Sequence, residues 1–231
     1  RRVFADGTPD IVAYPATRRG WGELTKLLTV GNLRAVKGGC ILHYEDLTAY
    51  LDDLLLIVLP TSTATEQQVH RNPVDYDFAD RPPGELVQHG HLSLVPPPRP
   101  ADLAALLRRL ARLAPGRVWL GAPLRRDGRD ARRLARFQRL SDRAGVPLLA
   151  TMDAPYANPA QRPLQDVLTC IRAGTTIGKA GRRLEANAER HLKPPQEMAR
   201  LFREAPEAIE EIQHLFGRIA FDLGELKYEY P

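Results

Sequence analysis

Apolar residues follow two patterns along this chain. Short apolar runs bounded by Pro, Gly or charged residues are typical of buried strands, whereas apolar positions spaced by three and four residues are typical of helices with one buried face. The first pattern predicts strands at residues 2–5, 10–13, 40–42, 54–59, 117–121 and 146–151. The second predicts a helix that Thr17 caps and Gly31 ends, and further helices at 45–51, 101–113, 130–144, 164–171, 194–202 and 206–219.

The order of these elements predicts an α/β fold. Strands and helices alternate between residues 54 and 151, which is typical of strand–helix–strand units in a parallel sheet. Near the N-terminus, Asp6-Gly7 lies between two predicted strands and favours a tight hairpin turn. From Pro163 onward the pattern is helical. We therefore divide the chain into residues 1–160 and a helical part at 161–231.

Residues 61–100 differ from the rest. They contain "NPVDYDFADRPPGE" and "VPPPRP", which are rich in proline and polar residues and keep no sustained period. Such a composition is typical of a long, loosely packed connection. We expect a variable insert here.

Composition places the chain among ordinary globular proteins. Its 231 residues are 43% hydrophobic and 26% charged, and no apolar run is long enough to cross a membrane. The two cysteines, Cys40 and Cys170, have no metal-binding spacing. We interpret them as reduced thiols and expect a cytoplasmic protein.

The net charge of +5 permits an anionic partner such as nucleic acid but does not demonstrate one. Much of the excess comes from arginines between residues 108 and 143, on helices whose other faces are apolar. A solvated surface is the more common reason for such a pattern. As a hypothesis, Arg129, Arg132, Arg133 and Arg136 form an exposed basic face that contacts DNA.

Asp153 is the one candidate for chemistry that the pattern itself indicates. It follows the apolar run "PLLATM", and an acidic residue at the carboxyl end of such a strand can be a metal ligand or a general base. An Asp that caps a loop is the more common alternative. His89 and His91 form an H-x-H pair, but in a proline-rich loop they are more often exposed polar residues. His191 precedes a predicted helix start, where a first-turn role is more common than metal ligation.

Three stretches carry a family resemblance. "PLQDVLTCIRAGTTI" at 163–177, "RRLEANAERHLKPPQEMARLF" at 182–202 and "PEAIEEI" at 206–212 resemble the C-terminal part of the PHP domain of bacterial C-family DNA polymerases. Within this family, the three stretches are most similar to the error-prone, damage-inducible branch, the DnaE-like polymerases of ImuC type. Residues 10–40 resemble the same branch, and 222–231 resemble the segment that leads to the polymerase palm.

The resemblance implies a partial, distorted (β/α)7 PHP barrel followed by a helical segment. It also implies that the chain is incomplete at both ends, with the family's first metal-binding strands before Arg1 and the catalytic palm after Pro231. The parent would be a DNA-directed DNA polymerase that extends DNA from dNTPs, with Mg²⁺ in its palm and no cofactor in this part. The expected partners are DNA, the palm and thumb of the same chain, and ImuB-type and sliding-clamp proteins.

The resemblance further implies that the PHP metal site has degenerated. Metal-binding relatives carry "ND-x-HY" after the strand equivalent to 147–153, and here Asp153 and Tyr156 match while Pro155 stands at the histidine position. A second metal-site histidine corresponds to Arg125. Proline offers no lone pair and arginine stays protonated, so Asp153 would be a vestigial ligand in a non-catalytic, structural region. The alternative is a metal-dependent phosphoesterase, for which His89 or His91 would have to supply a ligand.

Overall fold

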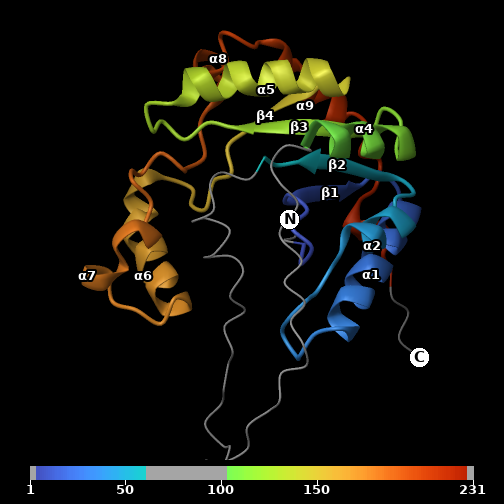
Figure 1. Ribbon diagram of the computed structural model, residues 1–231, viewed down its shortest axis with the longest axis horizontal. Coiled ribbons are helices and arrows are strands. Elements are labelled where there is room, and N and C mark those ends of the chain that lie inside the picture. Colours follow the sequence, from blue (N-terminus) through green and yellow to red (C-terminus); the bar gives the residue numbers. More distant parts are fainter. Residues whose placement is uncertain (1–3, 61–102, 228–231) are drawn as a thin grey trace, which may run out of the picture.

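The computed structural model describes residues 4–60 and 103–227 of the chain. Figure 1 shows their helices and strands. In chain order these are β1 (Ile11–Pro15), α1 (Arg18–Leu33), α2 (Tyr44–Ala49), β2 (Leu54–Val58), α4 (Leu103–Leu113), β3 (Val118–Pro123), α5 (Asp130–Ala144), β4 (Leu148–Thr151), α6 (Arg162–Arg172), α7 (Ile177–Ala180), α8 (Pro195–Leu201) and α9 (Glu207–Phe216). Short 3-10 turns η2 (Pro159–Gln161), η3 (Gly181–Arg183) and η4 (Leu223–Glu225) lie between or after them.

The described strands form one sheet in the order β1-β2-β3-β4. β2, β3 and β4 are parallel, and β1 pairs with β2 in the antiparallel sense, with Ile11 opposite Val58. The predicted α/β class is thus confirmed, and the three later strands have the expected parallel arrangement.

β2 is buried on both faces, which explains its unbroken apolar sequence. Leu54, Leu56 and Val58 join the main core, to which α4 and α5 also contribute apolar side chains. The alternate residues of the strand pack with Trp119 of β3 and Leu215 of α9 in a second cluster. Helices therefore cover the sheet on both sides.

Local signals set the helix boundaries. The hydroxyl oxygen of Thr17 accepts a hydrogen bond from the backbone N–H of Gly20 at 3.2 Å, which confirms the predicted cap of α1. α5 spans the predicted residues and ends at Gly145, whose φ of 66° lies in the left-handed region that glycine tolerates. The start of α1 and the end of α5 are thus set by residues next to the helix in sequence. The predicted end of α1 at Gly31 is wrong, because the helix continues to Leu33.

Two predicted strands are not found among the described residues. Phe4 and Ala5, the described part of 2–5, lie outside any strand, and β1 takes β2 as its partner, so the residues described here form no hairpin around Asp6-Gly7. Residues 40–42 also lie outside any strand, although Leu42 is buried. Single backbone bonds, such as Ala5 N–H to the Leu42 carbonyl at 2.8 Å, hold these segments in place of a ladder. Apolar burial alone thus produced a strand-like pattern.

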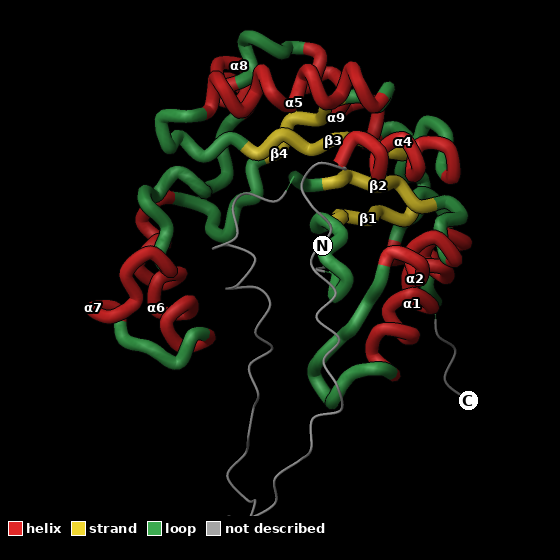
Figure 2. Tube along the Cα trace, viewed as in Figure 1, coloured by secondary structure: helices red, strands yellow, loops and turns green. Residues whose placement is uncertain are grey.

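The predicted insert at 61–100, including His89 and His91, lies outside the described residues, and the predicted division at residue 160 stays a prediction. Beyond that division α8 and α9 pack onto the sheet, since Phe202 joins the main core. α6 and α7 lie to one side of the sheet (Figures 1 and 2). None of the described helices combines the length and the apolar character that crossing a membrane requires.

A short C-terminal segment returns to the start of the fold. The backbone N–H groups of Ala220 and Phe221 both donate to the carbonyl of Ala16, at 2.9 and 3.1 Å. The Phe221 ring stacks on Trp21 of α1 with 5.5 Å between ring centroids. Residues 220–221 are thereby attached to the end of β1 and to α1.

Candidate functional site

Asp153 lies just beyond β4, as the sequence predicts. Its φ of 48° falls in the left-handed region, which Asp tolerates better than most residues with a side chain. The side chain is 15% exposed. Its carboxylate is therefore fixed at the carboxyl end of the sheet and needs partners there.

Two arginines supply these partners. Arg190 donates from Nη2 to Asp153 Oδ2 at 2.8 Å and from Nε to the Asp153 carbonyl at 3.1 Å, and its Nη1 bonds Glu185. Arg125 Nη2 lies 3.7 Å from the same Asp153 oxygen. We call Asp153, Arg125, Arg190 and Glu185 the Asp153 cluster. Arg125 comes from the loop between β3 and α5, and the other two come from the loop that precedes α8.

The charges of the Asp153 cluster depend on each other. Burial lowers the pKa of the Arg125 guanidinium, and the nearby positive charge of Arg190 lowers it further, while Asp153 and Glu185 raise it. Two half-buried cations at one strand end are thus stabilised by two carboxylates. Removal of either carboxylate would leave two guanidinium groups with only one carboxylate of the cluster beside them.

These residues do not fit a divalent metal ion. Both arginines point cationic groups at the Asp153 carboxylate, and Pro155 offers no ligand atom. Within residues 4–60 and 103–227, no group of three or more His, Cys, Asp or Glu side chains is placed to hold a metal. The metal set that the resemblance implies would thus meet opposing charge here as well as missing side-chain donors.

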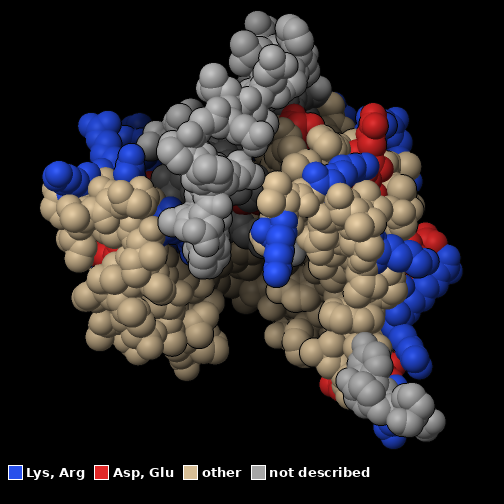
Figure 3. Space-filling model, turned by 90° about the horizontal axis from the view of Figure 1, so that it is seen from below, with Lys and Arg blue, Asp and Glu red and all other residues tan. Residues whose placement is uncertain are grey.

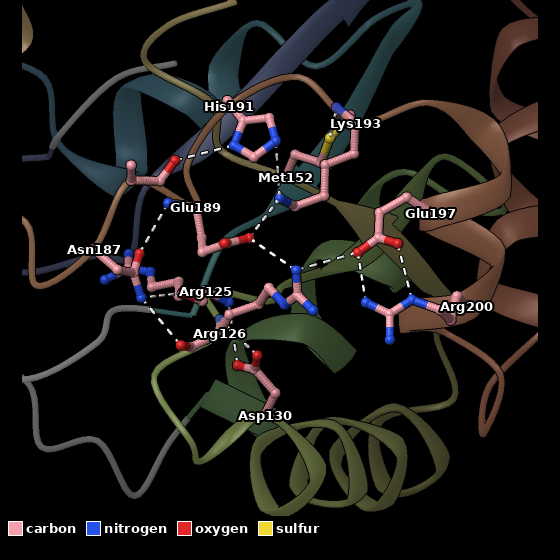
Figure 4. A network of polar contacts seen from close by, with 11 residues as sticks. Arg125, Arg126, Asp130, Met152, Asn187, Glu189, His191, Lys193, Glu197 and Arg200 are labelled. Carbon is pink, nitrogen blue, oxygen red and sulfur yellow. Dashed lines mark hydrogen bonds and ion pairs between the residues drawn. The ribbon is translucent and has the colours of Figure 1, made fainter. Parts of the chain in front are cut away.

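A second cluster lies beside the first and is shown in Figure 4. Lys193, whose side chain is 3% exposed, donates to Glu189 Oε2 at 3.0 Å and lies 3.4 Å from His191 Nε2. His191 Nδ1 lies 3.0 Å from the Ala188 carbonyl, which can only accept. His191 Nδ1 is therefore the protonated nitrogen, and Nε2 accepts from Lys193.

Arg126 connects this second cluster to the loop after β3. Its Nη1 bonds Glu189 Oε2 at 3.2 Å and lies 3.4 Å from Glu197 Oε1 of α8. We call Arg126, Glu189, His191, Lys193 and Glu197 the Glu189 cluster. The hydrogen bond from Lys193 lowers the pKa of the Glu189 carboxyl, and Arg126 lowers it further.

Further hydrogen bonds join the two loops through Asn187 and fix the loop after β3 through Asp130. Asn187 Nδ2 donates to the carbonyls of Arg125 and Arg126 at 3.1 and 3.0 Å. The Asp130 carboxylate accepts from the backbone N–H groups of the same two residues, at 3.1 and 2.6 Å. His191 also pairs with Tyr156 in an isolated β-bridge, so the predicted first-turn role for His191 is wrong. Ion pairs and hydrogen bonds together close the carboxyl ends of β3 and β4.

The arginines in and next to α5 differ in their exposure to solvent. Arg129, Arg132 and Arg136 are exposed, as predicted. Arg133 is not, because its side chain is 18% exposed and pairs with Asp130 at 2.6 Å and with Asp127, whose pKa it lowers. Two further exposed arginines extend the row, and we call the set the α5 arginine face: Arg129, Arg132, Arg136, Arg139 and Arg143. DNA binding by this face stays a prediction.

Arg125 was placed near Asp153 by the resemblance, but Arg190 and Glu185 were missed from the sequence. Both lie in "LEANAERHLK", which supported the resemblance but gave no sign of its contacts. The available signal was the mixture of acidic and basic residues in a stretch without helical period. Opposite charges close together in a loop are often paired with each other or with a neighbouring loop.

The fold and the two clusters define an α/β domain in which ion pairs and hydrogen bonds close the ends of two parallel strands. Comparison with known proteins then places this domain. Over its whole length the chain is 46% identical to an error-prone DNA polymerase of Rhodopseudomonas palustris (strain BisB5) and 43% identical to one of Sinorhizobium medicae (strain WSM419). In both it corresponds to 18% of the relative, so it spans about a fifth of the length of these polymerases.

A third relative, the error-prone DNA polymerase of Rhodopseudomonas palustris (strain BisA53), is 47% identical over 241 aligned positions, which include the whole chain and 21% of that protein. No protein-family model matches the chain. The chain is therefore a relative of one segment of the error-prone DNA polymerases, which confirms the resemblance noted in its sequence.

Proposed function

We propose that this chain is a non-catalytic, structural segment of an error-prone DNA polymerase, namely a partial PHP barrel and its helical end. The observation that carries the proposal is the contact of Asp153 with Arg190 at 2.8 Å and with Arg125 at 3.7 Å. A carboxylate that neutralises two guanidinium groups is not available to hold a divalent ion as well. Its role is to join the ends of two parallel strands.

The arginines favour a structural role because of their geometry. Arg190 contacts the side chain and the backbone of Asp153 and also Glu185, so one planar group fixes three acceptors. Such multiple contacts hold loops rigidly. Like a bound metal ion at a strand end, they hold the loops in place. Unlike a metal ion, they do not act as a Lewis acid that polarises a substrate.

The parent protein, on this proposal, extends DNA from dNTPs during damage-induced synthesis. The names of the relatives support this activity. The catalytic Mg²⁺ would be held by the palm, in another part of the polymerase, and the partners would be DNA, the palm and thumb, and ImuB-type and sliding-clamp proteins in the cytoplasm. The present segment would support the palm rather than take part in phosphoryl transfer.

The test is an Asp153→Asn substitution in the complete polymerase. Asn keeps the tolerance for a left-handed backbone and removes only the charge. We expect unchanged zinc and manganese content and unchanged primer extension, together with a loss of stability of about 1–3 kcal/mol because Arg190 and Arg125 lose one of their two counter-charges. Elemental analysis, extension assays and thermal unfolding would measure the three quantities.

The matched control is Asp52→Asn, an exposed ion-paired acid at 58% side-chain exposure, which should change none of the three. Stoichiometric zinc or manganese that is lost in Asp153→Asn would contradict the proposal. A phosphodiesterase activity lost with it would then establish the alternative, a metal-dependent phosphoesterase.

A further inference from the structure

Helix α6 has its apolar side turned to solvent. Leu164, Val167, Leu168 and Ile171 are 61%, 40%, 46% and 69% exposed. Gln165, Asp166 and Thr169, on the other side of the helix, are only half-exposed. A surface helix of a globular protein normally has the opposite arrangement.

The four apolar residues form one continuous surface. Their spacing of three, one and three residues places them on one side of the helix, with none of the charged residues of α6 among them. We call these four residues the α6 apolar face. In Figure 3 the lobe that carries α6 and α7 shows a broad surface with few charged side chains.

The polar side of α6 is the side that this domain uses. Arg162 Nη2 donates to the Glu185 carbonyl at 2.6 Å, which ties the start of the helix to the loop of the Asp153 cluster. Cys170 of α6 and Ala180 of α7 are buried, at 4% exposure each, and the two helices contact each other. The helix is therefore held in place with its apolar face outward.

The contact of such an apolar face with water is energetically unfavourable. Burial of large aliphatic side chains stabilises a protein, and a contiguous group of exposed ones marks an interaction surface. Adjacent apolar side chains without a charge in their midst are typical of the centre of a permanent interface.

We propose that the α6 apolar face packs against an apolar surface elsewhere on the same polymerase chain. The inference rests on the proposed function, that this chain is one segment of a longer polymerase. In the relatives the matching segment is 18–21% of the protein, so about four-fifths of each polypeptide lies outside it and is joined to it covalently. A tethered occupant is present at a high effective concentration, which favours it over a separate partner.

Thiol labelling of the complete polymerase tests the inference. Leu168→Cys and Val167→Cys place a small thiol in the α6 apolar face with little disturbance of packing, and Arg172→Cys places one at an exposed position outside the face on the same helix. Each labelling rate is measured by peptide mass spectrometry in the native polymerase and in urea, and the two are compared. The native Cys170 is followed in the same peptide.

We expect the thiols at 167 and 168 to react about tenfold or more slowly in the native protein than in urea, while the thiol at 172 reacts at similar rates in both. Equal reactivity of all three would overturn the inference. Protection that disappears on dilution would also overturn it, because the occupant would then be a second copy. A complete protein that does not extend primers would count against the proposed function, whereas the labelling result would still show whether the face is covered.

Discussion

At the scale of single residues, fixed charges hold together the loops at the carboxyl ends of β3 and β4. Arg190 and Lys193 lie three residues apart in one loop. Arg190 pairs with Asp153, and Lys193 pairs with Glu189. Lys193 depends more on its partners than Arg190 does. Its side chain is 3% exposed, and its ammonium group contacts Glu189 and His191. A buried charge without a partner strongly destabilises a fold.

Glu189→Gln tests this dependence. At neutral pH the substitution should lower the free energy of unfolding by about 1–3 kcal/mol, because Lys193 loses its charged acceptor. The pKa of Glu189 is lowered from its ordinary value of 4.5, so its contribution is present above that value and is lost as the pH falls through the lower, folded-state pKa. Wild type should therefore lose more stability than the variant between about pH 6 and about pH 3.

Urea unfolding at a series of pH values measures the effect. Glu210→Gln, on the exposed side of α9, is the matched control and should follow the pH profile of the wild type. If Glu189→Gln follows it too, the Glu189 cluster does not stabilise the fold through charge.

At the scale of elements, the sequence predicts what neighbouring residues decide. α5 is predicted at its observed bounds because a regular apolar stripe and the Gly145 stop are both local signals. Residues 40–42 are predicted wrongly because a strand needs a pairing partner, which no local pattern reveals. The same holds for the site: Asp153 is local to β4, whereas Arg190 reaches it across 37 positions.

Two glycines of α1 separate packing from helix propensity. A methyl group on Gly20 would collide with the backbone carbonyl of Asp53, whereas one on Gly22 would have no neighbour within 4 Å. Gly20→Ala should therefore destabilise the domain by about 1–3 kcal/mol. Gly22→Ala should stabilise it by about 0.5–1 kcal/mol, because alanine favours the helix.

Thermal unfolding of the two variants against wild type provides the measurement. The opposite signs within one helix act as the control, since an effect on α1 alone would move both in the same direction. A stabilising Gly20→Ala would show that α1 does not approach the Asp53 turn as closely as described.

At the scale of the whole molecule, two surfaces have different character. The α5 arginine face carries basic residues at positions 132, 136, 139 and 143, a spacing that lines up side chains along one side of a helix. The α6 apolar face lies on a separate lobe (Figure 2). One surface suits phosphate groups, and the other suits a buried protein contact.

Charge reversal tests the arginine face in the complete polymerase. Replacement of Arg132, Arg136 and Arg139 by Glu should weaken binding to duplex DNA and reduce the slope of log affinity against log salt by about 2–3, since each phosphate contact contributes about 0.9. Arg133 is left unchanged because its ion pairs with Asp127 and Asp130 support the loop before α5.

The control is Arg19→Glu with Arg203→Glu, two exposed arginines away from α5, at 68% and 74% side-chain exposure. It should lower the net charge without the same change in slope. Unchanged affinity and slope in the α5 variant would show that this face is a solvated surface only.

The stacking of Trp21 on Phe221 gives the chain a built-in pair of optical reporters. Trp119, the other of its two tryptophans, is 2% exposed within the sheet. Release of residues 220–221 would alter the fluorescence of Trp21 and leave that of Trp119 unchanged until the sheet itself opens. With one tryptophan replaced by Phe at a time, partial detachment of the tail and global melting become separately visible.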